Sequence, residues 1–266
     1  QAAAAGGVTC IIVQPNTEPV IDEVALVEYI KRQARDKAVV RIHPMAAITK
    51  GLRGDKMAEL GLLAEADAVA FTDADRAVAD AQVMRRVLSY ASAFNLLICH
   101  YPEEPSLAGS GVMNAGEIAM RLGLPGIPTQ AETIMVERDL RLVEMTGGRY
   151  HAACLSTAQA IEALSAGKAR GLPVSAAAAV HSFALNETAV GEYRTFAKTA
   201  PPLRSEADRQ AVVTGLADGT IDVICSCHDP QDVESKRLPF ELAAAGIIGL
   251  ETMLPLALEL YHNGAI

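Results

Sequence analysis

The segment Leu216–Gln231, with the sequence LADGTIDVICSCHDPQ, decides the fold class of this chain. An Asp-Gly turn leads into the apolar run Ile221–Cys225, which only Asp222 interrupts, and the run stops at the polar cluster Ser226–Asp229. A short apolar run of this kind is typical of a parallel strand that is buried on both faces. Such strands deliver side chains to a site at their C-terminal ends, so we expect the chemistry of the protein to lie in that polar cluster.

Similar short apolar runs alternate with helical patterns along the whole chain, as in folds with a parallel sheet covered by helices. The predicted strands begin near Thr9, Val39, Ala68, Leu96, Tyr150, Val174 and Asp222. The predicted helices cover residues 24–37, 55–65, 80–94, 115–122, 131–146, 157–170, 205–217 and 251–262.

A closed barrel needs eight strands, one more than this pattern supplies. The first residues, QAAAAGG, resemble the last turn of a helix with a glycine stop, so we expect the missing strand to be the first. We therefore predict an α/β fold, a (β/α)8 TIM-type barrel without its first strand. We expect residues 1–266 to form a single domain, and the flanking segments of a longer natural chain to be absent here.

Composition narrows the class of protein. The chain has 266 residues, 50% of them apolar, and a formal net charge of −9 without a cluster of basic residues. Nucleic acids and anionic membranes bind clustered lysine and arginine, so we exclude both as partners. No apolar stretch approaches the roughly 18 residues of a membrane span, and we expect a cytoplasmic protein. The five cysteines are irregularly spaced, which favours reduced thiols over a disulfide framework.

Polar side chains lie at the predicted C-terminal ends of the strands, where a barrel builds its site. These residues are Asn16, His43, Asp73, His100, Tyr101, Glu104, Cys154, His181, Cys227 and His228. Histidine, carboxylate and thiolate are the common metal ligands, so the set as a whole suggests a metal-dependent hydrolase. Any single member of the set is also explained as a packed or capping residue.

Four segments carry a resemblance to a known family. Gln1–Val20 is similar to A-A-A-x-G-G-x-T-x-x-x-x-M-P-N-T-x-P, and Ala197–Arg209 to K-x-N-P-P-L-R-S-x-x-D-R. Gly246–Thr252 is similar to G-I-V-G-L-E-T, and the segment from Asp218 to Gln231 to D-G-T-I-D-x-I-x-[TS]-D-H-A-P-H. These are motifs of the dihydroorotases, cyclic amidohydrolases of the amidohydrolase superfamily. The resemblance covers nearly the whole chain. It implies a zinc-binding barrel in which metal-bound hydroxide attacks a ring amide.

The resemblance also shows where this chain departs from the family at the metal site. It places Glu104 at a metal-binding Asp, Tyr101 at a His, Cys154 at the His of the sixth strand, and His181 at the His of the seventh. Cys227 stands where the family has the Asp that is both ligand and general base. The His-x-His of the first strand would lie upstream of residue 1. We therefore expect no metal at these relic positions.

The positions that the family uses for substrate are also altered. Asn16 and Arg204 match the family pattern, whereas Ala200 replaces an Asn and Gln231 replaces a His. A general base must accept a proton and return it to the leaving nitrogen, and a thiol at Cys227 does this poorly either as thiol or as metal-bound thiolate. We therefore expect no catalytic residue in this chain.

The leading hypothesis is a catalytically silent dihydroorotase-like protein of pyrimidine biosynthesis that needs no cofactor. Resemblance implies a structural partner, the catalytic chain of aspartate carbamoyltransferase, because some bacteria carry degenerate dihydroorotase-like chains that assemble with it. We expect an oligomer. Two alternatives remain: an active zinc-dependent dihydroorotase with unusual ligands, and a module that binds a small molecule or a metal through thiols.

Overall fold

The computed structural model describes residues 1–266. Its internal contacts divide the chain into two compact units, each built from separate stretches of sequence. Unit 1 consists of Gln1–Tyr101, Arg138–Ala153 and Gly167–Val174. Unit 2 consists of Pro102–Glu137, Cys154–Ala166 and Ser175–Ile266. The single domain expected over 1–266 stays a prediction. None of the helices combines the length and the hydropathy that crossing a membrane requires.

Short strands alternate with helices along the chain, as the sequence predicts. The strands are β1 (Cys10–Val13), β2 (Arg41–Pro44), β3 (Leu97–His100), β4 (Met113–Asn114), β5 (Gly126–Ile127), β6 (Arg149–Ala152), β7 (Val174–Ala179) and β8 (Val223–Cys225). The longer helices are α2 (Val24–Lys37), α4 (Ala81–Ala93), α7 (Gln130–Thr146), α8 (Ala158–Ala169), α10 (Glu206–Ala217) and α12 (Met253–His262). The shorter ones are α1 (Ala2–Ala5), α3 (Leu60–Glu65), α5 (Pro105–Ala108), α6 (Glu117–Leu122), α9 (Val180–Ala184) and α11 (Val233–Lys236), with 3₁₀ turns η1 (Lys50–Leu52), η2 (Glu187–Val190) and η3 (Thr195–Ala197).

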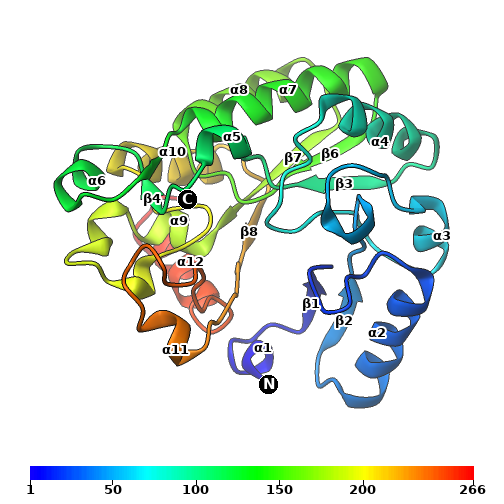
Figure 1. The fold of residues 1–266 in the computed structure, drawn as a ribbon, viewed down its shortest axis with the longest axis horizontal. Coiled ribbons are helices and arrows are strands. Elements are labelled where there is room, and N and C mark those ends of the chain that lie inside the picture. Colours follow the sequence, from blue (N-terminus) through cyan, green and yellow to red (C-terminus); the bar gives the residue numbers. More distant parts are fainter. The chain divides into compact units, whose positions relative to one another are not determined.

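Unit 1 contains two parallel strand pairs. β1 pairs with β2, with Cys10 opposite Arg41, and α2 runs beside β2 (Figure 1). β3 pairs with β6, with Leu97 opposite Arg149. The strand predicted over residues 68–73 is reduced to Phe71, which forms isolated parallel bridges with Ala46 and Ile98. The apolar composition of that run is explained by burial of Phe71 and its neighbours and not by a full ladder.

Helix α4 shows how sequence sets the boundaries and the buried face of an element in unit 1. Asp80 caps the N-terminus, because its carboxylate accepts hydrogen bonds from the backbone N–H groups of Gln82 and Val83. The buried residues recur at the spacing of one helical face. They are Met84, Val87, Leu88 and Ala91.

Unit 2 contains the segment that opens the sequence analysis. β8 pairs in parallel with β7, with Ala179 opposite Cys225. The predicted Asp-Gly turn precedes it, with Gly219 in the left-handed region at φ 79°. Asp222, the polar residue inside the apolar run, accepts a hydrogen bond of 2.8 Å from the backbone N–H of Ala176. This carboxylate therefore fixes the register in which the two strands pair. The small parallel pair of β4 and β5 was not predicted.

Two buried lysines of unit 2 are held by backbone carbonyls. Lys198 Nζ donates to the carbonyl oxygens of Phe240 at 2.8 Å and Glu241 at 2.9 Å. Lys236 Nζ donates to those of Thr195 at 3.1 Å and Ala244 at 2.8 Å. Burial lowers the pKa of both side chains. The two ammonium groups thus join the segment around η3 to the chain that follows α11.

Candidate functional site

Three cysteines of unit 2 bring their thiols together at the C-terminal end of β8. Cys154 Sγ lies 2.8 Å from Cys227 Sγ and 3.6 Å from Cys225 Sγ, and the last two are 3.3 Å apart. None of the three forms a disulfide, because their separations are well above the roughly 2.05 Å of an S–S bond. We call Cys154, Cys225 and Cys227 the thiol cluster. Two of its members were predicted at the site and now lie in contact.

Cys225 is the member that the sequence analysis missed. It ends β8, its thiol donates to the carbonyl oxygen of Ala178 at 3.3 Å, and it lies two positions before Cys227. Side chains two positions apart on a strand point to the same face. The spacing Cys-x-Cys at a strand end was therefore the available signal that both thiols face one site.

His181 follows β7 by the same distance as Cys227 follows β8. Ala179 is the register partner of Cys225, and both strands end at this pair, so His181 lies in α9 and Cys227 in the loop after β8. The histidine is 4% exposed, and neither ring nitrogen has a hydrogen-bond partner in the protein. The hydroxyl of Ser182 is also buried and unpaired. Each such group costs on the order of 1–3 kcal/mol when nothing binds it.

The electrostatics of the thiol cluster favour neutral thiols in the absence of a cation. Contacts with Cys225 and Cys227, together with burial, raise the pKa of Cys154 well above its usual value. For Cys227, the contact with Cys154 lowers the pKa, but the contact with Cys225 and burial outweigh it, and the pKa is about 12. Burial lowers the pKa of His181, while nearby Cys227 acts in the opposite direction. A bound cation would reverse this preference, because it stabilises thiolates.

The backbone around the cluster is held in an unusual conformation. Cys154 and Cys227 have φ values of 53° and 40°, in the left-handed region that costs an ordinary residue about 1 kcal/mol or more. A Cβ at Gly249 would lie 1.9 Å from the carbonyl oxygen of Ser226, so only glycine fits against this backbone. His228 Nδ1 accepts from the backbone N–H groups of Gly249 and Leu250. His228 was expected at the site, but its Nδ1 holds the chain that supports the cluster.

The other predicted relic positions of unit 2 have different surroundings. The carboxylate of Glu104 caps α5 by accepting from the N–H and hydroxyl of Ser106. Ala200 is exposed. Gln231 is half-buried with its amide close to Gly246. Their assignment to substrate or metal stays a prediction.

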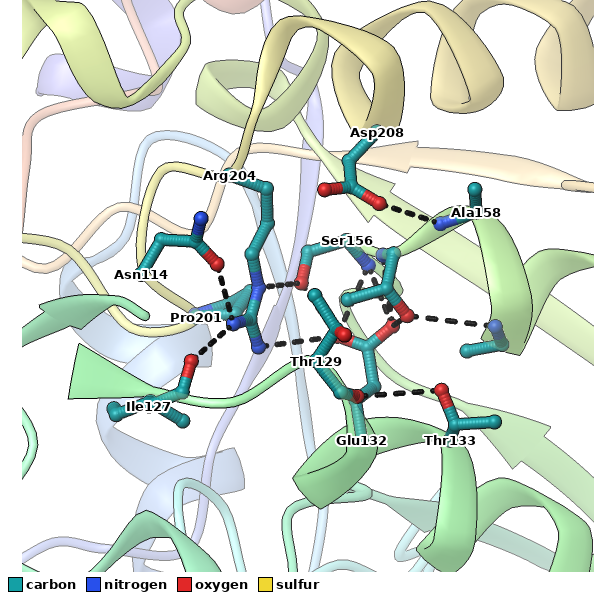
Figure 2. A network of polar contacts seen from close by, with 12 residues as sticks. Asn114, Ile127, Thr129, Glu132, Thr133, Ser156, Ala158, Pro201, Arg204 and Asp208 are labelled. Atoms are coloured by element: carbon teal, nitrogen blue, oxygen red, sulfur yellow. Dashed lines mark hydrogen bonds and ion pairs between the residues drawn. The ribbon is translucent and has the colours of Figure 1, made fainter. Parts of the chain in front are cut away.

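Arg204 is the centre of a buried polar network in unit 2. Nε donates to Ser156 Oγ at 3.1 Å, and Nη1 donates to Asn114 Oδ1 at 3.1 Å and to the carbonyl oxygen of Ile127 at 2.9 Å (Figure 2). Nη2 lies 4.0 Å from Glu132 Oε2. Protein groups therefore occupy most of the guanidinium donors. Only the N–H groups of Nη2 remain for the predicted contact with a substrate.

Glu132, near the start of α7, binds the loop that follows Cys154. Its carboxylate accepts from the backbone N–H groups of Ser156 at 3.0 Å and Thr157 at 2.9 Å, and from both hydroxyls (Figure 2). The side chain is buried. This network was not predicted from the sequence. It fixes the residues directly after the first cysteine of the cluster.

His100 belongs to unit 1 and has a structural role there. Nε2 accepts from the backbone N–H of Val78 at 2.9 Å, so Nδ1 carries the proton and donates to Asp139 Oδ2 at 2.7 Å. Asp139 also accepts from Tyr150 and Arg138. Burial by itself raises the pKa of Asp139, but His100 and Arg138 lower it more. With both nitrogens used, His100 has no lone pair left for a metal, contrary to its place in the expected set.

The remaining strand-end residues of unit 1 also lack the features of a ligand set. Asp73 is buried and accepts from the backbone N–H groups of Ile48 and Thr49 and from the Thr49 hydroxyl, so it closes a loop. Burial raises its pKa. Asn16 and His43 are exposed, and Tyr101 is buried.

The donor set of unit 2 does not fit the zinc site that the family resemblance implies. That site needs a carboxylate able to act as base beside imidazole ligands. Here Cys227, which the resemblance places at the base, is a thiol in contact with two other thiols, and Glu104 caps a helix. The donors that do converge are the three sulfurs of the thiol cluster.

Comparison with known proteins gives consistent matches. A family model described as "Dihydro-orotase-like" matches residues 1–160. The chain is 48% identical over 266 residues to a dihydroorotase of Syntrophotalea carbinolica and 45% identical over 265 residues to one of Desulfotalea psychrophila. In both cases the match covers 100% of this chain and 63% of the relative. The chain thus spans less than two thirds of the length of these curated relatives.

Solved structures show the fold that this chain shares. An L-hydantoinase from Arthrobacter aurescens matches with a TM-score of 0.85 and 21% identity, over 100% of this chain and 61% of the other. A dihydroorotase from Saccharomyces cerevisiae, in complex with 5-fluoroorotic acid, matches with a TM-score of 0.77 and 16% identity, over 99% and 73%. The predicted TIM-type fold is confirmed as a partial barrel, and the chain belongs to the dihydroorotase-like family.

Proposed function

We propose that this chain is a catalytically silent member of its family that acts in pyrimidine biosynthesis as a structural component. The observation that carries the proposal is the state of Cys227, at the position of the family's general base. Its thiol lies 2.8 Å from one thiol and 3.3 Å from another, and its pKa is about 12. At neutral pH it holds its proton and cannot accept another. Bound to a metal as thiolate, it is equally unable to act as base.

The changes on the substrate side support the same proposal. Three of the four guanidinium contacts of Arg204 go to Ser156, Asn114 and Ile127. Ala200 has no polar side chain where the family has an amide. Binding energy that is realised only in the transition state raises the catalytic rate, so the loss of such contacts lowers it.

The first test is a steady-state assay of the full-length protein for interconversion of dihydroorotate and carbamoyl aspartate, with added zinc. The dihydroorotase of Syntrophotalea carbinolica serves as the positive control. We expect no measurable turnover. Turnover near the enzyme median of about 10 per second would overturn the proposal.

The second test concerns the double variant Cys154→His, Cys227→Asp. We expect it to stay far below the positive control, because Ala200 and Gln231 still lack the family's substrate contacts. Full activity from these two changes would show that the metal site alone had been lost.

The proposed partner is the catalytic chain of aspartate carbamoyltransferase. Support comes from the resemblance to degenerate dihydroorotase-like chains and from the retained fold: a scaffold without its base needs another reason to persist. Co-expression followed by analytical sedimentation at micromolar concentration is the test. We expect a joint species. Two independently sedimenting proteins would contradict the partnership and leave the assay result unaffected.

A further inference from the structure

The sulfur atoms of the thiol cluster satisfy the first requirement of a metal site, which is convergence of donors on one point. The three Sγ atoms lie within 4.8 Å of one another. Sulfurs 2.8–3.6 Å apart can all lie about 2.3 Å from one cation placed to one side of their plane. The sequence analysis expected no metal here and considered only two of these thiols. The structure adds a third sulfur donor.

His181 is not one of the converging donors. Both of its ring nitrogens are buried and unpaired, which is rare for a polar group that the protein itself must satisfy. The histidine lies in α9, two positions after Ala179, the register partner of Cys225. The donors that converge within 4.8 Å are the three thiols alone.

The chain around the cluster is fixed before any ligand binds. Gly249 packs against Ser226, which lies between Cys225 and Cys227, and His228 accepts two backbone N–H groups from the same segment as Gly249. On the other side, Glu132 binds the backbone N–H groups of Ser156 and Thr157, just after Cys154. Ligand side chains that are already held in place lose little conformational entropy when a metal binds, so the binding free energy is not reduced by a cost of ordering them.

We propose that Cys154, Cys225 and Cys227 together bind one thiophilic divalent cation, with zinc as the natural occupant. Thiolate is a common ligand of zinc, and three thiolates fill three of its four tetrahedral positions. The bound cation ties the loop after β6 to the end of β8. This inference stands on the donor geometry and does not depend on the proposed silence or on a partner.

The test uses the full chain, purified under reductant without chelator, and measures zinc by mass spectrometry. Metal-free protein is then titrated with Cd²⁺, which reports thiolate ligands by an ultraviolet charge-transfer band. We expect one equivalent of metal and a saturating band at one equivalent. Cys225→Ser and Cys154→Ser should each weaken binding on the order of 100-fold or more. Cys10→Ser, which removes an exposed thiol outside the cluster, should bind as the wild type does.

A second readout needs no variant of the site. In pulsed alkylation of the wild-type protein, bound metal should protect Cys154, Cys225 and Cys227 and leave Cys10 reactive. A metal content below about half an equivalent per chain, measured under reductant, would overturn the inference. It is equally overturned by cadmium binding that persists unchanged in Cys225→Ser, or by metal that leaves the alkylation of the three thiols unaltered.

Discussion

Two buried histidines of this protein differ in what surrounds their rings. His100 ends β3 in unit 1, and both of its nitrogens are bonded, one to the N–H of Val78 and one to Asp139. His181 follows β7 in unit 2, and neither of its nitrogens is bonded. One is the last residue of a parallel strand and the other follows such a strand by two positions. The difference teaches that a place near a strand end does not show whether a buried histidine is bonded within the fold, whereas the partners of its ring nitrogens do.

The largest effect should come from removing the satisfied histidine. His100→Leu leaves the Val78 N–H and part of the buried Asp139 carboxylate unpaired, so we expect a loss of about 3 kcal/mol in the free energy of unfolding. Urea unfolding followed by circular dichroism measures it. His43→Leu, at an exposed histidine of the same unit, is the control and should change stability by less than about 0.5 kcal/mol. Equal stability of the two variants would remove the basis of the comparison.

A second prediction asks whether a satisfied network in unit 2 behaves as the one in unit 1 does. Glu132→Gln replaces an acceptor oxygen by a donor that faces the hydrogen-bond donors of Ser156 and Thr157. We expect a loss of about 2 kcal/mol, measured by the same unfolding experiment. The exposed Glu137, on the same helix, provides the control variant Glu137→Gln. A loss no larger than that of the control would mean that the buried network adds nothing to stability.

The pH dependence sharpens the role of His100. In the wild type the pKa of Asp139 is lowered, so its stabilisation is present at neutral pH and declines as pH falls through the usual carboxyl range near 4. In His100→Leu one lowering partner is gone and burial acts to raise this pKa, so protonation relieves the buried charge as pH falls. The stability gap between the two proteins should therefore narrow, by about 1 kcal/mol, between pH 7 and pH 4. A constant gap would assign the cost of the variant to packing alone.

The smallest effect should come from the unsatisfied histidine. In metal-free protein, His181→Leu removes two unpaired nitrogens and keeps an apolar side chain of similar size, so we expect a change within about 1 kcal/mol. Unfolding is measured with a chelator present. A loss as large as that of His100→Leu would show that the ring has partners within the protein and would break the contrast between the two histidines.

Much of the fold could be predicted because it follows from periodicity. The helix predicted over residues 24–37 matches α2. The helix predicted over 80–94 extends one residue beyond α4 at each end. The strand predicted at residues 68–73 and the helix predicted at 55–65 were only partly right, since Phe71 alone forms bridges and α3 starts at Leu60. Apolar runs report burial, and burial does not require a hydrogen-bonded ladder.

The site was harder to predict because its chemistry depends on partners from distant segments. Cys154 and Cys227 were identified through the resemblance, but the third thiol was overlooked although strand alternation indicated it. His100 and Asp73 could not be separated from ligands without knowing that Val78 and Thr49 bind them. Glu132, a polar residue in an amphipathic helix, gave no signal that it would be buried beneath the loop after Cys154.

The lysine-carbonyl contacts of unit 2 have a consequence for the order of events during synthesis. Lys198 and its acceptor Phe240 are 42 residues apart in the chain, and Lys236 also reaches back to Thr195. At about 5–20 residues per second, the ribosome delivers the acceptors of Lys198 seconds after the lysine itself. Until then the ammonium group lacks these acceptors, and the contacts that join η3 to the later chain are missing. During synthesis, the η3 segment is therefore exposed to misassembly until residue 244 has emerged, although most of the barrel strands have already been made.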